Sequence, residues 1–215
     1  MIELQINELK GKIVSFSYHI ETMLQKSIQG LLENDVKILD EVIEVLEKEA
    51  NKLDNKIEKS CVSALAQYSP KALNLRLILM IVKMNKDLER MGDHCVNISY
   101  NAKDIFELDY SKQKFFDLIA EMSLETKDML SKSIKSFIDE DVELASSVTM
   151  RDEKVNTYQA ELTKYFLDKM KNKPKSVESS FYFVNIVNNL ERIADLATNI
   201  AEDVVFIFEG KVVKH

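Results

Sequence analysis

The chain is 215 residues long, 46% of them hydrophobic, and its 36 acidic and 29 basic side chains leave a net charge of -7. This composition can build a continuous core, and the negative charge disfavours nonspecific attraction to nucleic acid or to anionic lipid. Because only 4 glycines and 2 prolines are present, the backbone has few places to turn sharply. A few long helices are therefore favoured over a fold of many strands.

Two amphipathic helices are predicted before the first proline. Residues 2–31 form the first of them, and the polar passage 33–35 marks the turn that ends it. Asp35 is expected to be the N-cap of the second helix, because a carboxylate there accepts from unpaired backbone N–H groups. The apolar residues of that second helix, at helical spacing, are Leu39, Ile43, Leu46, Ala50, Leu53 and Ile57.

A third, longer helix is predicted after Ser69 and Pro70. A proline suits the first helical turn, where its missing N–H would have no intrahelical partner. The apolar residues then alternate four-residue and three-residue steps, which is typical of a long amphipathic helix packed in a bundle. They are Leu77, Ile81, Met84, Leu88, Met91, Cys95, Ile98, Ala102 and Ile105.

The same order of elements then recurs. The segment MLQKSIQGLLENDV (23–36) is matched by MLSKSIKSFIDEDV (129–142), within a first helix expected over residues 115–138. Asp141 is expected to cap the next helix, as Asp35 does in the first copy. The apolar series of that next helix is Leu144, Val148, Val155, Tyr158, Leu162 and Tyr165. After Lys173 and Pro174, the last series is Val187, Leu190, Ala194, Ala197, Ala201, Val204 and Phe208.

This repetition indicates a tandem duplication. We therefore predict an all-α protein of six long amphipathic helices, arranged as two tandem three-helix bundles over residues 1–108 and 109–215. The break at residues 108–111 has no Gly/Ser-rich or Pro-rich linker, so the two repeats are expected to pack closely.

Each third helix carries a row of acidic and amide side chains, which we call a ladder. In the first copy Glu89, Asp93 and Asn97 are spaced by four residues, so they share one helix face. The ladder of the second copy consists of Glu191, Asp195, Asn199 and Glu202. The apolar seam places both ladders on the outer side of the bundle, where their oxygens could bind a hard cation.

The second helices carry further oxygen donors that an adjacent ladder could use. These donors are Glu47 and Asn51, with Asp54, in the first copy and Asp152 and Asn156, with Glu153, in the second. Two interpretations stay open: a divalent or iron cation bound by pooled oxygens, or a solvated face with surface ion pairs such as Glu89–Arg90 and Glu191–Arg192. The second ladder has more ligands and is expected to bind a cation more firmly.

Other residues of interest are given structural roles. Cys61 and Cys95 lie at apolar helical positions without CxxC spacing and are expected to be reduced core residues. His94 points about 100° away from Asp93 around the helix, and His19 and His215 have no partner at ligand spacing. Without a Gly-rich phosphate loop or a nucleophile motif, we expect a protein that is not an enzyme and needs no organic cofactor.

The two third-helix motifs carry a family resemblance. DLERMGDHCVNI (87–98) and NLERIADLATNIAEDV (189–204), together with SPKALNLR (69–76) and FEGKVVKH (208–215), resemble the PhoU family of regulators of phosphate-specific transport. The resemblance covers the whole chain. Leu196 stands where the family often has His, and Asn51 and Asn156 stand where it often has Asp.

The resemblance implies a role, partners and a metal. It implies a cytoplasmic homodimer that restrains phosphate uptake and phosphate-regulon signalling by protein contact. Its implied partners are the ATP-binding subunit of the phosphate ABC transporter and the sensor histidine kinase of the phosphate regulon. From the net charge we expect no nucleic acid as a partner, and because no stretch approaches the roughly 20 apolar residues needed to cross a bilayer we expect no membrane insertion. Iron or another metal would bind at the acidic motifs. The alternatives are a metal-storage bundle and an accessory protein of another phosphate transporter.

Overall fold

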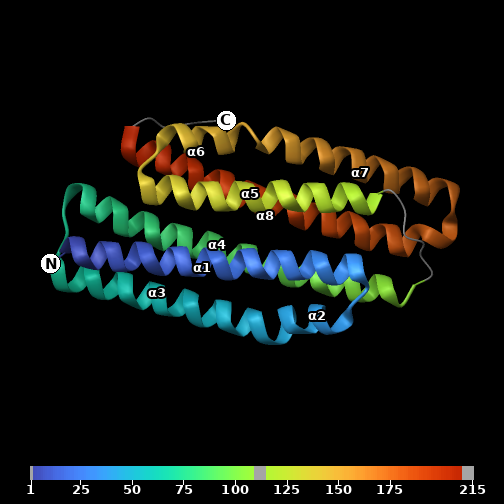
Figure 1. Cartoon of the computed structure of the whole chain (residues 1–215), viewed down its shortest axis with the longest axis horizontal. Helices are drawn as coiled ribbons and strands as arrows, with labels where there is room; N and C mark the ends of the chain where they lie inside the picture. The colour runs from blue at the N-terminus through green and yellow to red at the C-terminus, as the bar shows by residue number, and fades with distance from the viewer. Residues whose placement is uncertain (1, 109–114, 210–215) are drawn as a thin grey trace.

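The structure, a computed structural model, describes residues 2–108 and 115–209. Within these ranges the chain is helical apart from short turns and contains no strand, which confirms the predicted all-α fold. The six long helices form two three-helix layers that lie along each other in an elongated body (Figure 1). None of the described helices has a stretch both long enough and apolar enough to cross a bilayer.

The first repeat contains three long helical stretches. The middle one runs without interruption through a π-helical segment, η1, that joins two α-helices. The elements of this repeat are α1 (Ile2–Glu33), α2 (Val36–Glu41), η1 (Val42–Leu46), α3 (Glu47–Tyr68) and α4 (Ala72–Phe106).

The second repeat has the same order, but its middle stretch is interrupted at Met150 and Arg151. Its elements are α5 (Phe115–Asp139), α6 (Val142–Thr149), α7 (Asp152–Asn172), the 3-10 helix η2 (Pro174–Ser176) and α8 (Val177–Glu209). Part of the break expected at residues 108–111 lies outside the described residues.

The turn between the first and second helices is built in the same way in both repeats. Asp35 accepts hydrogen bonds from the backbone N–H groups of Lys37 and Ile38, and Asp141 accepts one from that of Leu144. The residue before each cap is in the left-handed region, with φ 61° at Asn34 and 57° at Glu140. Both predicted N-caps are confirmed.

The two prolines differ in their places. Pro174 opens η2, which leads into α8, as expected for a proline in a first turn. Pro70, in contrast, lies between the helices, because α3 ends at Tyr68, Ser69 follows in a left-handed conformation, and α4 begins only at Ala72. The prediction that Pro70 starts the helix was wrong.

The middle helices of the two repeats differ by one residue in length before they come into register. From the cap to the first predicted cation donor there are twelve steps in the first copy, Asp35 to Glu47, and eleven in the second, Asp141 to Asp152. A π-helical turn takes up one extra residue, so η1 accommodates this difference. Beyond it, buried side chains occupy matching positions in α3 and α7, namely Ala50 with Val155, Ile57 with Leu162, and Cys61 with Phe166.

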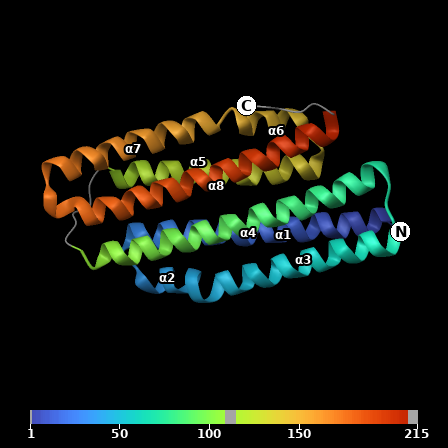
Figure 2. The ribbon, with the colours of Figure 1, turned by 180° about the vertical axis from the view of Figure 1, so that it is seen from behind.

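The core lies where these helices face one another. α4 packs against α1, α3 and α8, and the repeats meet through the α4–α8 and α1–α5 contacts (Figure 2). Cys61 and Cys95 are buried free thiols, as expected. Tyr165, predicted in the core, is 38% exposed, whereas Phe166 is fully buried. Phe166 follows the buried Leu162 by four residues, so it returns to the same helix face.

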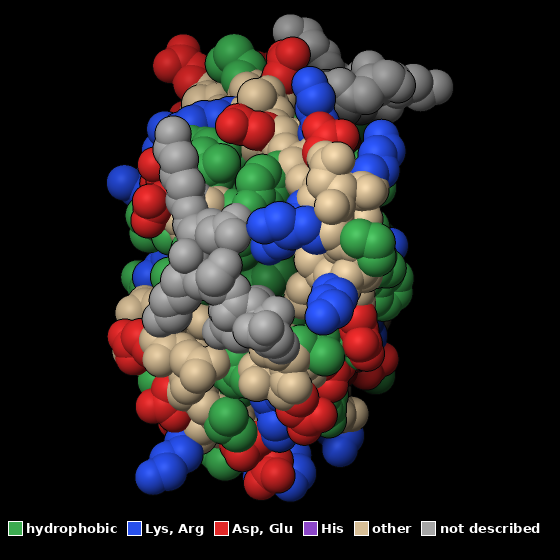
Figure 3. Space-filling model, turned by 90° about the vertical axis from the view of Figure 1, so that its right-hand side faces the viewer, with side chains coloured by type: hydrophobic (Ala, Val, Ile, Leu, Met, Phe, Trp, Pro, Cys, Tyr) green, Lys and Arg blue, Asp and Glu red, His purple; other side chains and the backbone are tan. Residues whose placement is uncertain are grey.

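The surface is mixed in charge at the end of the molecule where the first repeat leads into the second. Seen from that end, acidic and basic side chains are interspersed with apolar ones (Figure 3).

Candidate functional site

The two ladders lie on α4 and α8 at equivalent positions. In the first, Glu89 is half-buried while Asp93 and Asn97 are exposed. The second repeats this pattern at Glu191, Asp195 and Asn199, and its additional member Glu202 is half-buried. The ladders therefore have exposed central members, as the apolar seam predicted, but their first residues are partly covered by the neighbouring helix.

In the second repeat the structure brings the predicted donors together. A groove of about 730 Å³ runs between α7 and α8, and we call it the acidic groove. Every residue predicted for this copy lines it except Glu191. Its lining residues are Thr149, Asp152, Glu153, Asn156, Asp195, Thr198, Asn199 and Glu202. Sequence reasoning did not identify Thr149 and Thr198, whose hydroxyls carry no distinctive spacing signal.

Asp152 is the residue of α7 that connects the two walls of the acidic groove. Its Oδ2 atom accepts a hydrogen bond of 2.8 Å from Asn156, and its Oδ1 atom accepts one of 3.5 Å from the Thr198 hydroxyl on α8. These contacts leave room for further ligands on both carboxylate oxygens, since each oxygen can accept more than one bond.

The groove has an excess of negative charge. Burial, followed by the charge of Asp152, raises the pKa of Asp195 above its ordinary value. The pKa of Glu191 is raised by burial, then by Asp195 and Asp152, against a smaller opposing effect of Arg192. Carboxylates that resist ionisation because of like charges nearby gain from any cation placed among them.

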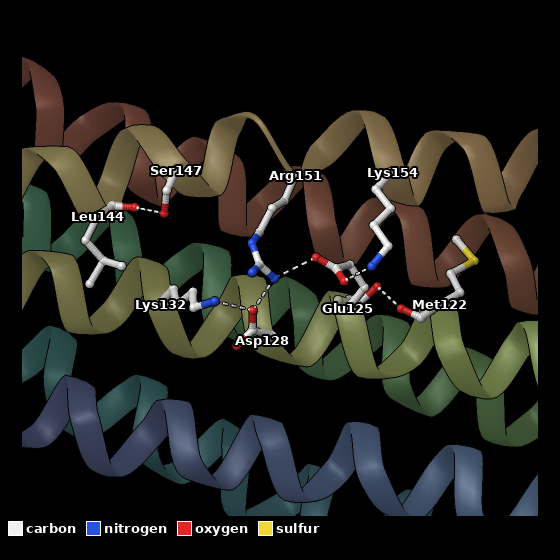
Figure 4. A network of polar contacts seen from close by, with 9 residues as sticks. Met122, Glu125, Asp128, Lys132, Leu144, Ser147, Arg151 and Lys154 are labelled. Atoms are coloured by element: carbon white, nitrogen blue, oxygen red, sulfur yellow. Dashed lines mark hydrogen bonds and ion pairs between the residues drawn. The ribbon is translucent and has the colours of Figure 1, made fainter.

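An ion-pair network holds the start of α7 in place (Figure 4). Arg151, at the interruption before α7, lies 2.7 Å from Glu125 and also pairs with Asp128, both on α5. Lys154 lies 2.7 Å from the other oxygen of Glu125, and Lys132 lies 2.6 Å from Asp128. Because Arg151 directly precedes Asp152 in the chain, this network positions the α7 wall of the acidic groove.

In the first repeat a lysine neutralises a carboxylate between the second and third helices. Lys86 on α4 lies 3.0 Å from both carboxylate oxygens of the buried Asp54 on α3. At the equivalent positions of the second repeat, Gln159 donates a 3.3 Å hydrogen bond to Asn188. A lysine and a carboxylate in one copy are thus replaced by two neutral amides in the other.

Glu89 is affected by this lysine. Burial and then Asp93 raise the pKa of Glu89, while Lys86 acts in the opposite direction. No lysine acts in this way on Glu191. The ion pair expected between Glu89 and Arg90 is not among the salt bridges of the described residues, and Arg90 lies 3.9 Å from Asp87 instead. The ammonium group of Lys86 thus supplies positive charge beside the first ladder.

Of the predicted donors of α3, Asp54 lies near the first ladder, since its charge, after burial and Asp93, helps to raise the pKa of Glu89. Glu47 is half-buried, and the exposed Asn51 lines a separate groove between α1 and α3. Within residues 2–108 and 115–209, no three His, Cys, Asp or Glu side chains form a cluster arranged to hold a metal. The donors of the acidic groove are carboxylate, amide and hydroxyl oxygens, a set that suits a hard cation rather than a thiolate-ligated cluster.

The described histidines make structural contacts. His94 on α4 lies 2.8 Å, through Nδ1, from the Oδ1 atom of Asn189 on α8, so it links the repeats. His19 on α1 bonds through Nε2 to the carbonyl of Leu46, the last residue of η1, at 2.8 Å. Its Nδ1 atom is 4.0 Å from Glu49, a carboxylate neighbour that the sequence pattern did not indicate. His215 lies outside the described residues.

Comparison with known proteins identifies both repeats. The family model of the PhoU domain matches residues 13–102 and, a second time, residues 119–204. A relative from Aquifex aeolicus, named phosphate-specific transport system accessory protein PhoU homolog, is 30% identical over 211 residues, covering 98% of this chain and 94% of its own. A relative of the same name from Pseudomonas putida is 26% identical and covers 98% of this chain and 82% of its own.

Solved structures agree with these matches. The crystal structure of the phosphate transport system regulatory protein PhoU from Streptococcus pneumoniae has a TM-score of 0.91 at 25% identity and covers 100% of both chains. The crystal structure of PhoU from Pseudomonas aeruginosa has a TM-score of 0.92 at 24% identity, covering 98% of this chain and 100% of its own. The second of these similarities concerns the fold alone.

Proposed function

The chain belongs to the PhoU family, and from that membership we propose that it is an accessory regulator of a phosphate-specific transport system. The proposal rests on one observation, the match of the family's domain to both repeats, which together make up most of the chain. In its finer form, the protein is a cytoplasmic negative regulator of phosphate uptake and of phosphate-regulon signalling. It works by protein contact and not by catalysis.

The proposed partners are the ATP-binding subunit of the phosphate ABC transporter and the sensor histidine kinase of the phosphate regulon, and the proposed assembly is a homodimer. An elongated bundle of long helices (Figure 1) is suited to such contacts, because helices offer rigid surfaces for a partner.

This regulatory role is tested in a deletion strain. Phosphate uptake in phosphate-replete medium is expected to rise without the protein, and expression of phosphate-regulon promoters should become insensitive to phosphate. Purified protein is expected to bind the purified transporter subunit and the kinase in pull-down experiments. Unchanged uptake in the deletion strain together with no binding to either partner would contradict the proposal.

We further propose that a hard divalent or iron cation binds in the acidic groove rather than at the first ladder. Support comes from the convergence of Asp152, Asp195 and Glu202 on one groove and from the raised pKa values of Glu191 and Asp195. A cation there would relieve repulsion between carboxylates. At the first ladder Lys86 already supplies positive charge.

Titration with Mn²⁺ tests the cation site. Wild-type protein is expected to bind about one equivalent in the acidic groove, and Asp152→Asn with Asp195→Asn should weaken binding at least about tenfold because two charged ligands are lost. Affinity should also fall as the pH is lowered, since carboxylates with raised pKa values retain protons more strongly.

A matched control removes two exposed carboxylates of α7 outside the groove, by Glu161→Gln with Asp168→Asn. It changes net charge as much as the test variant and should leave Mn²⁺ binding within about twofold of wild type. Equal losses in both variants would show that only overall charge attracts the cation. Unchanged phosphate regulation in the test variant would separate cation binding from the regulatory role.

A further inference from the structure

A second groove, of about 690 Å³, lies between α1 and α3 of the first repeat, and we call it the lysine groove. Four of its lining residues are lysines and one is acidic, although the chain as a whole is negative. Its lining residues are Gln5, Glu8, Lys12, Asn51, Lys52, Asn55, Lys56, Lys59, Ser60, Ser63, Ala64 and Gln67.

The lysines form a row along α3 with one more opposite. Lys52, Lys56 and Lys59 are exposed and follow one face of the helix, spread over about 10 Å at the rise of an α-helix. Lys12 on α1 contacts the α3 wall by donating a 2.9 Å hydrogen bond to Ser60. The acidic residue of the lining, Glu8, lies 2.7 Å from Lys12.

Most of this positive charge has no counterpart within the described chain. Among residues 2–108 and 115–209, neither Lys52 nor Lys59 forms a salt bridge. Lys56 acts on Glu8 only through its charge, after Lys12. Like charges three and four residues apart on a helix repel one another, so the row destabilises α3, and among the residues that line the groove only Glu8 is acidic and offsets it in part.

The second repeat shows that the fold does not need this row. Aligned through their buried residues, α3 and α7 place Thr157 where α3 has Lys52 and Glu161 where α3 has Lys56. On the other wall, the residue equivalent to Lys12 is Leu118. The position equivalent to Lys59 keeps a lysine, Lys164. The second copy therefore builds the same helices with one of these four positive charges, so folding does not require the other three.

We propose that the lysine groove docks an acidic segment of a partner protein. A single small anion would need donors that converge on one point, whereas these ammonium groups are spread along the helix and match a row of carboxylates. Lysines bind as separate point charges on flexible stems, which suits such a row. The side-chain amides of Asn51 and Asn55 and the hydroxyl of Ser63 can add hydrogen bonds to the backbone of the bound acidic segment. This surface adds to the proposed regulatory role and does not depend on it.

The test measures binding of the full chain to a short fluorescein-labelled peptide rich in Asp and Glu, by anisotropy in about 20 mM and about 150 mM NaCl. The triple variant Lys52→Glu, Lys56→Glu, Lys59→Glu is expected to bind at least about tenfold more weakly than wild type, because three attractions become repulsions. Binding of wild type should weaken with added salt.

The matched control reverses three exposed lysines of the second repeat, Lys164→Glu, Lys173→Glu and Lys175→Glu. It carries the same change in net charge and should stay within about threefold of wild type. Circular dichroism verifies that both variants are folded. A neutral peptide with Gln and Asn in place of Glu and Asp should not bind.

Three results would overturn the proposal. Equal weakening in the two triple variants would mean that only net charge matters. Tighter binding of inorganic polyphosphate than of the acidic peptide, lost in the lysine-groove variant, would assign the groove to a non-protein polyanion. Self-association at low salt that disappears in this variant alone, measured by light scattering, would assign it to a second copy of this chain.

Discussion

Replacing Asp87 by asparagine is expected to stabilise the protein at neutral pH and to leave its stability in acid unchanged. Asp87 lies on α4 with only 6% of its surface exposed. Its Oδ2 atom is buried without a hydrogen-bond partner among the described residues. At the equivalent position of the second repeat, Asn189 is bonded to His94. The residue equivalent to His94 is Leu196, an apolar side chain that cannot pair with Asp87.

The size of the effect follows from the pKa of Asp87. Burial, with Asp203 adding repulsion against the opposing effect of Lys83, raises this pKa from 3.8 to about 6. Below 3.8 the carboxyl is neutral in both folded and unfolded chains. As the pH rises toward 6 the unfolded chain releases the proton first, so stability is lost. At about 1.4 kcal/mol for each tenfold difference, ionised Asp87 costs about 3 kcal/mol above pH 6.

The assay is urea unfolding of wild type and Asp87→Asn, followed by circular dichroism between about pH 4 and pH 8. The free energy of unfolding of the variant should exceed that of wild type by about 2 to 3 kcal/mol at pH 8 and by nearly nothing at pH 4. Asp104→Asn, an exposed carboxyl on the same helix, controls for the loss of one charge. Parallel curves for wild type and Asp87→Asn across this range would refute the reasoning.

Three further substitutions test contacts elsewhere, each by the shift of the urea midpoint. His94→Leu removes the 2.8 Å bond to Asn189 between the repeats and should cost about 1 to 2 kcal/mol. Gly30→Ser places Cβ 2.5 Å from a Leu39 methyl group and should cost about 1 to 3 kcal/mol. The cost of Gly30→Ser should be smaller when Leu39→Ala is also present, and strictly additive free-energy changes of the two substitutions would contradict this. Asp35→Ala loses two cap bonds and should cost about 1 kcal/mol. An unchanged urea midpoint in Asp35→Ala would show that the cap does not stabilise the protein.

The contact between Gly30 and Leu39 differs between the two repeats in a way that sequence similarity alone did not reveal. At the equivalent positions of the second repeat are Ser136 and Ala145, a larger and a smaller residue, both buried. At the same contact, the first repeat thus has a small residue on the first helix and a large one on the second, and in the second repeat the size difference is smaller. Sequence similarity located both helices, but the reciprocal change becomes meaningful only when the helices are seen to touch.

Local pattern was enough to predict the helices. The apolar series of α4 and α8 and the caps at Asp35 and Asp141 were read directly, because helical periodicity and capping depend on neighbours within one or two turns. The ladders were found for the same reason, since residues four apart share a face in any α-helix. The predictions for Pro70 as a helix start and for Tyr165 as a core residue were wrong, because the start of a helix and its rotation about its axis also depend on packing.

Tertiary structure decided which charges meet. The placement of Asp152 beside Asp195 depends on how α7 lies against α8 and on the ion pairs of Arg151 that hold its start. Likewise, Asn51 turned out to line the lysine groove. The sequence by itself determined a duplicated six-helix protein with two acidic ladders. Only the packing of helices distant in sequence made one ladder the wall of a groove lined by carboxylates and left the other beside Lys86, because contacts between helices are not encoded in local spacing.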